Sequence, residues 1–173
     1  MGQYYDIIIK NVNGDAKKFK PKDDGFKLME FSDFNANMVD IICNELYHET
    51  CKVYVVGDYA DETDAKNPLT PVTNQLLENL RHTKEGTPNK NIFNTRNKIV
   101  LNYTKGLYYE IEDNEPFKLF LLCSIGNGKG GGDYVGVASN ECGKWFGDHI
   151  KIIDKREFDP SIWEHYEVVF DEC

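Results

Sequence analysis

The chain has 173 residues, of which 40% are hydrophobic and 13% aromatic, so its composition supports a folded core and excludes a disordered chain. Its formal net charge of -9 disfavours non-specific binding to nucleic acid or to an anionic membrane. Such a charge suits a basic protein partner, a cation or simply solubility. The length fits one domain over residues 1–173, with residues 62–97 as a candidate insertion.

The cysteines and the N-terminus indicate a compartment. The five cysteines are odd in number and none has Cys-x-x-Cys spacing, which favours free thiols in a reducing cell. No basic segment precedes the short apolar stretch at the N-terminus, as a signal peptide would require. The longest apolar runs are only a few residues, too short to span a bilayer. We therefore expect a cytoplasmic protein without a membrane partner.

The N-terminal part of the sequence predicts a hairpin of two strands, a short strand, a helix and a further strand. Alternating apolar residues predict a hairpin over 4–21, in which Asn13-Gly14 favours a type I′ turn. A short strand is expected at 27–31. Apolar residues at helical spacing then predict a helix within 32–49, and 51–57 has the pattern of a buried strand that leads into an acidic loop.

The C-terminal half is predicted to be mainly strands after one helix. Thr70 as N-cap and Pro71 at the first position favour a helix over about 71–82. Strand-like segments follow at 98–103, 107–112, 117–125, 133–138, 148–153 and 165–170. Because strands and helices do not alternate, the sequence predicts an α+β fold, with an antiparallel or mixed sheet of short strands and about two helices packed on it.

A glycine-rich loop follows the segment 117–125. Gly126, Gly128 and Gly131 satisfy G-x-G-x-x-G, but the helix that a dinucleotide site requires is missing after them, and no Gly-Lys-Ser/Thr forms a P-loop. The loop is interpreted either as an anion-binding nest assisted by Lys129 or as a wide hairpin in which glycine supplies positive φ. In the first interpretation the ligand-binding candidates are Gly128, Lys129, Gly130, Gly131, Asp133, Tyr59 and Trp145. Trp145 can equally be a core residue.

Acidic residues offer a second candidate site. Asp58, Asp61, Asp133 and Asp148 lie in or near turns and could together bind Mg²⁺ or Ca²⁺, which prefer oxygen ligands. Aspartate beside glycine is also ordinary turn chemistry, in which case no cofactor is expected. A metal there would suit a phosphoesterase or nucleotide hydrolase, which requires Asp58, Asp133 and Asp148 to lie close together.

Two segments are locally basic in this acidic chain, residues 17–22 and 89–98. Lysines and arginines in such segments can contact phosphate groups. Lysines also protect the exposed edge of a sheet, which explains the first segment equally well.

Several longer motifs occur in a characteristic order, namely "MGQYY", "GFKLMEFS", "VYVVGDYADE" and "GNGKGGGDYVG". In these motifs the chain resembles a family of small uncharacterised proteins encoded by bacteriophages and mobile bacterial elements. It departs from that pattern at Phe31, where histidine is expected, and at Gly147, where a basic residue is expected. The resemblance implies no catalytic residue. It implies only this genomic setting. Together with the small size, the acidic charge and the lack of a complete catalytic motif in the sequence, the setting leads us to expect a non-enzymatic binding protein in the cytoplasm of a bacterial host, such as an anti-defence factor that binds a host protein or a nucleotide ligand.

Overall fold

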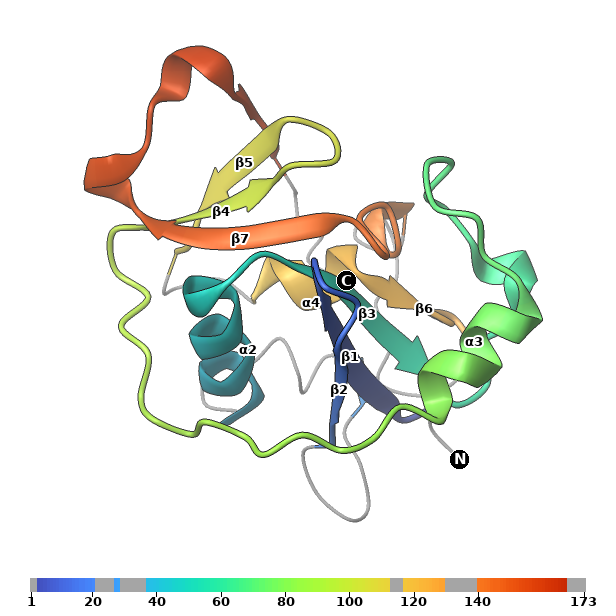
Figure 1. Cartoon of the computed structure of the whole chain (residues 1–173). Helices are drawn as coiled ribbons and strands as arrows, with labels where there is room; N and C mark the ends of the chain where they lie inside the picture. Colours follow the sequence, from blue (N-terminus) through green and yellow to red (C-terminus); the bar gives the residue numbers. More distant parts are fainter. Residues whose placement is uncertain (1–2, 21–26, 29–36, 113–116, 130–139, 168–173) are drawn as a thin grey trace.

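The computed structural model describes residues 3–20, 27–28, 37–112, 117–129 and 140–167 (Figure 1). These residues form a mixed, mostly antiparallel sheet in the order β2-β1-β3-β7-β4-β5-β8, with β6 paired to β3. The strands span Tyr5–Asn11 (β1), Ala16–Phe19 (β2), Cys51–Gly57 (β3), Lys98–Asn102 (β4), Leu107–Glu110 (β5), Ser124–Ile125 (β6), His149–Asp154 (β7) and Glu164–His165 (β8). The α+β prediction is therefore confirmed.

Helices lie on both sides of the sheet. The α-helices are α2 (Asn37–His48), α3 (Asn74–Arg81) and the short α4 (Lys118–Leu122), and single 3-10 turns occur at Glu62–Asp64, Lys155–Glu157 and Pro160–Ile162. No helix within the described ranges is long and apolar enough to cross a bilayer.

Strands β1 and β3 are buried on both faces. Ile7 and Ile9 of β1 pack in the larger core with α2 and α4, whereas Ile8 packs on the other face with Leu77 and Leu80 of α3. This division follows from the alternation of side chains along a strand. The predicted hairpin and its alternation are confirmed by the antiparallel register of β1 with β2.

Strand β3 divides its second edge between two partners. Its start pairs antiparallel with β7, and its end pairs parallel with β6 through Val55–Ser124 and Val56–Ile125. Parallel strands end at the same edge of a sheet. The turn after β3 and the glycine loop after β6 therefore emerge side by side.

Some local predictions are wrong, beginning with the start of α3 and the type of the first hairpin turn. Helix α3 begins at Asn74, because Thr73 Oγ1 accepts the Leu76 amide at 3.1 Å, and Thr70 is not its cap. In the first hairpin, Gly14 has φ of +89° but Asn13 is not left-handed, so the turn is not type I′. Asn11 Oδ1 instead accepts the Asn13 and Asp15 amides, which closes a wider loop.

The predicted strand 117–125 is mostly the helix α4, followed by the two-residue strand β6. Its apolar side chains are buried all round, and a continuous apolar run has no period that separates a buried helix from a buried strand. Of the other predicted strands, 133–138 lies outside the described residues. Of the predicted strand 27–31 only residues 27–28 are described, and Leu28 is helical, so the strand prediction is wrong there.

A long irregular segment, residues 83–97, connects α3 to β4 and is called the strap below. It runs past the edge of β2 and along α2 (Figure 1). The Lys18 amide donates to the Lys84 carbonyl at 2.9 Å, and the Gly86 amide donates to the Lys18 carbonyl at 3.0 Å. The strap thus covers the backbone edge that β2 would otherwise expose.

Candidate functional site

The two loops singled out in the sequence meet at the N-terminus. The buried side chain of Gln3 lies between the turn after β3 and the glycine loop after β6. Its Nε2 donates to the Gly126 carbonyl, and its Oε1 accepts the Tyr59 amide at 3.1 Å. A Cβ at Gly57 or Gly126 would overlap the Gln3 side chain, so glycine is required at both positions. Gly126 also has φ of +109°.

The glycine loop is attached to the acidic turn by its lysine. Lys129 Nζ lies 2.7 Å from Asp61 Oδ2 and 3.1 Å from Asp64 Oδ2. The hydrogen bond from Lys129 is the largest cause that lowers the pKa of Asp61 to about 2, and the hydrogen bonds from Thr63 come next. The hydrogen bonds to Asp61 and Asp64 in turn raise the pKa of Lys129. In this arrangement the Lys129 ammonium is already paired with two carboxylates, so its attraction for a phosphate group is weak.

The remaining ligand candidates are dispersed. Tyr59 is 45% exposed beside the same turn, whereas Trp145 is fully buried between Tyr109 and Tyr166, with ring centroids 5.9 and 5.2 Å away. Trp145 is thus placed in the core. Gly128 lies in the described part of the glycine loop, and Gly130, Gly131 and Asp133 lie outside the described residues.

The four aspartates proposed as metal ligands have different surroundings. Asp58 is exposed and accepts the Tyr4 amide at 3.1 Å, and Asp61 is occupied by Lys129. Asp148 is fully buried, and Asp133 is outside the described residues. Within the described part of the chain, no group of three or more His, Cys, Asp or Glu residues could hold a metal ion.

Asp148 belongs to a buried polar network at the start of β7. Its carboxylate accepts hydrogen bonds at 2.8 Å from the amides of Asn67 and Asn102 and pairs with the Lys105 ammonium. Lys105 also donates to Asn67 Oδ1 at 3.1 Å. Because the ammonium and two amides satisfy the carboxylate, its local role is to join the loop before α3, the β4–β5 turn and β7.

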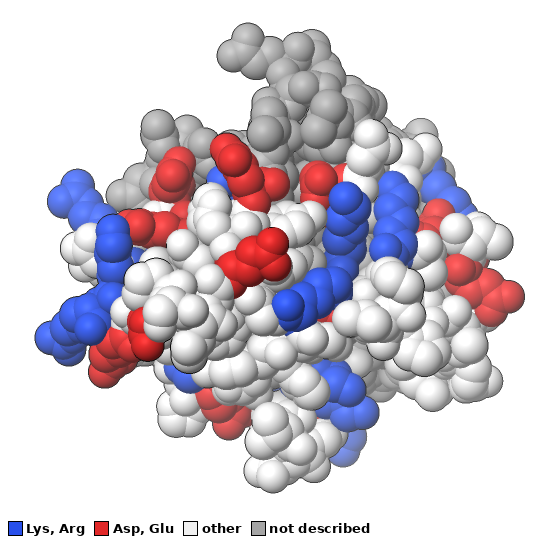
Figure 2. All heavy atoms as spheres, turned by 90° about the horizontal axis from the view of Figure 1, so that it is seen from above, with Lys and Arg blue, Asp and Glu red and all other residues white. Residues whose placement is uncertain are grey.

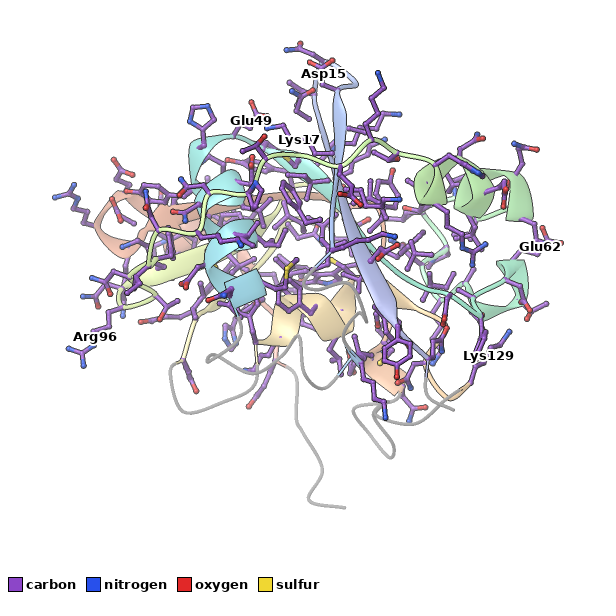
Figure 3. All side chains as sticks on the ribbon, turned by 90° about the horizontal axis from the view of Figure 1, so that it is seen from below. Asp15, Lys17, Glu49, Glu62, Arg96 and Lys129 are labelled. Atoms are coloured by element: carbon purple, nitrogen blue, oxygen red, sulfur yellow. The ribbon has the colours of Figure 1, made fainter. Side chains whose placement is uncertain are left out.

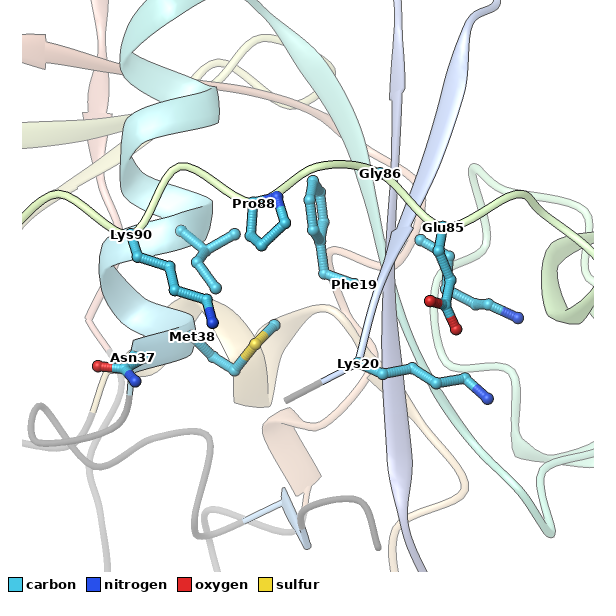
Figure 4. A pocket seen from close by; sticks show the side chains of 10 residues that line it. Phe19, Lys20, Asn37, Met38, Glu85, Gly86, Pro88 and Lys90 are labelled. Atoms are coloured by element: carbon cyan, nitrogen blue, oxygen red, sulfur yellow. The ribbon is translucent and has the colours of Figure 1, made fainter. Parts of the chain in front are cut away.

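The two basic segments converge on a cleft that the sequence did not predict. Lys18 and Phe19 of β2 and the next residue, Lys20, form one side, and Glu85, Pro88 and Lys90 of the strap form the other. Met38 and Ile41 of α2 complete an apolar floor with Phe19. In Figure 4, Lys90 extends towards Met38, whereas Lys20 extends from the end of β2 away from Met38. We call this pocket of about 200 Å³ the cationic cleft.

The cleft carries excess positive charge. Three lysines and one glutamate line it, a local balance of +2 in a chain with net charge -9. Lys18 Nζ donates to the Arg81 carbonyl at 2.7 Å. Lys20 and Lys90 form no ion pair with another described residue, although Lys20 acts electrostatically on Asp6.

Charge elsewhere on the surface is distributed differently. Positive and negative side chains are intermixed over the face shown in Figure 2. Figure 3 places Lys129 and Glu62 on one side of the molecule and Arg96 of the strap on the other. The glycine loop and the far end of the strap are therefore separate parts of the surface.

Comparison of the chain with protein-family models, with curated proteins and with solved structures gives no match. The site is accordingly interpreted from its own residues and geometry.

Proposed function

We propose that this protein is a non-enzymatic binding protein and that its cationic cleft receives an acidic side chain of a partner protein. The observation that carries the proposal is the convergence of the two basic segments, 17–22 and 89–98, around an apolar floor. An apolar floor with charges at the rim suits a protruding side chain, because the stem packs below while its charge meets the lysines.

The size of the cleft favours a protein partner over a free nucleotide. Pockets that enclose small organic ligands usually measure about 300–1,000 Å³. The cleft measures about 200 Å³, which is enough for one side chain or one anionic group. A nucleotide bound there would leave most of its surface in water.

The net negative charge is compatible with an acidic partner. At physiological ionic strength the Debye length is about 8 Å, so distant carboxylates on the chain act weakly on a group inside the cleft. The nearby lysines dominate the local potential. Binding should therefore weaken as salt is added.

The setting that we propose is the cytoplasm of a bacterial host, with a host protein as the partner and interference with host defence as the outcome. The resemblance to phage-encoded proteins supports this setting. Cys43, Cys51, Cys123 and Cys142 are all free and buried, which suits a reducing compartment.

A titration with poly-L-glutamate tests the proposal at residue level. Amide NMR signals of residues 18–20, 38–41 and 85–90 should shift, and the shifts should diminish with added salt. The charge-reversed variant K20E/K90E should lose them. The control K10E/K52E reverses two lysines that face each other on β1 and β3, outside the cleft, and should keep them. Shifts that avoid the cleft, or that survive K20E/K90E, would contradict the proposal.

A further inference from the structure

Hollows continue along the strap beyond the cationic cleft. A second pocket of about 620 Å³ is lined by Val39 and Asp40 of α2 and by Ile92 and Phe93 of the strap. A third, of about 450 Å³, lies where the end of the strap meets the end of β7. Asn37 lines both the cleft and the second pocket, and Asn94 and Arg96 line both the second and the third. Neighbouring hollows thus share lining residues along the strap, and we call the three together the track.

The middle of the track is apolar. Ile92 is 92% exposed, and its neighbour Phe93 packs on the core with its ring centroid 5.5 Å from that of Tyr47. The Phe93 amide donates to Asp40 Oδ1 at 3.1 Å, and Asn44 Nδ2 donates to the Asn91 carbonyl at 2.8 Å. These bonds on either side of Ile92 hold the strap on α2. An isoleucine presented in this way offers contact area to a partner.

The far end of the track is cationic again. Four basic residues line the third pocket with the carboxylate of Asp154, and one of them, Lys155, also pairs with Glu110 at 2.9 Å, so the local balance is +2. Lys98 lies 3.1 Å from Asp154, whereas the Arg156 side chain is 83% exposed and 3.7 Å from it. The Lys155 amide donates to the Asn97 carbonyl at 2.8 Å, which joins the two segments that form the pocket. We call this pocket the distal groove.

From this order of charges we infer that the partner segment is extended and carries an acidic, an apolar and a second acidic side chain in sequence. This inference rests on the function proposed above. The first acidic group enters the cationic cleft, the apolar group covers Ile92, and the second acidic group enters the distal groove. Charge complementarity selects an acidic peptide, because both ends of the track carry excess positive charge.

The strap sets the spacing within the partner. Ile92 lies two positions after Lys90, and Arg96 lies four positions after Ile92. An extended chain spans at most about 3.3–3.6 Å per residue, which limits these intervals to about 7 and about 14 Å. A matching peptide therefore places one acidic residue about two positions before its apolar residue and the other about four positions after it.

The probe is the synthetic heptapeptide Glu-Ser-Leu-Ser-Ser-Ser-Glu, titrated into the isotopically labelled protein and followed by amide NMR. Signals from the cleft, from residues 92–93 and from residues 94–98 and 154–156 should shift together with one dissociation constant. Replacement of the last glutamate by glutamine should remove the distal shifts and weaken binding about two- to fivefold. The protein variant R96E/R156E should have the same effect, and K10E/K52E should have none.

The outcomes separate the inference from the proposed function. If cleft signals shift but distal signals do not, or if R96E/R156E binds as well as the unaltered protein, the extended track is overturned and the cleft remains the binding site. If the cleft signals do not shift, both proposals fail. Thermal unfolding of each variant shows whether a loss of binding comes from a loss of fold.

Discussion

Gln3 and Gly126, 123 positions apart in sequence, are joined by a buried hydrogen bond from the Gln3 amide to the Gly126 carbonyl. The same Gln3 side chain accepts the Tyr59 amide at 3.1 Å. One residue near the N-terminus thus connects the ends of the two parallel strands β3 and β6. This connection explains the glycines at the two strand ends better than a phosphate cradle does.

Gln3→Ala should destabilise the fold by about 1–3 kcal/mol, because it leaves the buried Gly126 carbonyl and the partly buried Tyr59 amide without their partner. Urea unfolding measures this change. Gln3→Glu retains an acceptor but loses the donor to Gly126, so it should also destabilise. Unchanged stability of Gln3→Ala would show that Gln3 does not hold the two turns together.

Gly126→Ala should destabilise the fold for two reasons, a φ of +109° and a Cβ placed 2.5 Å from Gln3 Oε1. A substitution of this kind commonly costs about 1–3 kcal/mol. Gly128→Ala is the matched control, since it also has positive φ but no atom lies within 4 Å of its Cβ. The difference between the two midpoints in urea therefore isolates the steric contribution. Equal midpoints would refute the close packing of Gln3.

Asp148→Ala should be among the most damaging single substitutions, at about 3–5 kcal/mol, because it leaves the Lys105 ammonium and two buried amides without their acceptor. The exposed Asp58→Ala is the control and should change stability by less. Chemical denaturation compares them. If both variants unfold at the same denaturant concentration, the Asp148 network contributes nothing to the fold.

The bridge between Lys129 and Asp61 should give stability a defined pH dependence. The folded-state pKa of Asp61, about 2, lies below its ordinary value of 3.8. The bridge therefore contributes fully above about pH 4, and its contribution is lost as the pH falls towards 2. In Lys129→Met the pKa of Asp61 should return towards 3.8, as measured by NMR titration of the carboxyl carbon. A pKa that stays near 2 would show that Lys129 is not the cause.

The buried cysteines should resist alkylation in the folded protein. Burial raises the pKa of the Cys51 thiol to about 12 and that of Cys43 even further, so almost no thiolate is present at neutral pH. Iodoacetamide at pH 8 should label them only after denaturant is added. Mass spectrometry identifies the sites, and rapid labelling of Cys43 without denaturant would contradict its burial.

The sequence predicted those elements whose side chains follow a period. The alternation in β1 and the helical spacing in α2 led to correct assignments. The segment 117–125 failed because residues buried on every side carry no period, and α3 started late because Thr73 rather than Thr70 caps it.

The cationic cleft illustrates a different limit. Its basic segments are visible in the sequence, but their meeting depends on the path of the strap past β2 and α2, which is fixed by backbone bonds such as Lys18 to Lys84. No pattern in residues 83–97 encodes that path. The glycine loop and the acidic residues were both singled out from the sequence as candidate sites, whereas the pairing of Lys129 with Asp61 and Asp64 was not expected.

The affinity of the cleft for an acidic chain is the most direct measure of the proposed function. Fluorescence anisotropy with labelled poly-L-glutamate at low salt should show binding to the unaltered protein and to K10E/K52E with similar dissociation constants. Binding to K20E/K90E should be weaker by about tenfold or more, since two attractions become repulsions. Equal weakening in both variants, or none in K20E/K90E, would contradict the assignment of the cleft as the binding site.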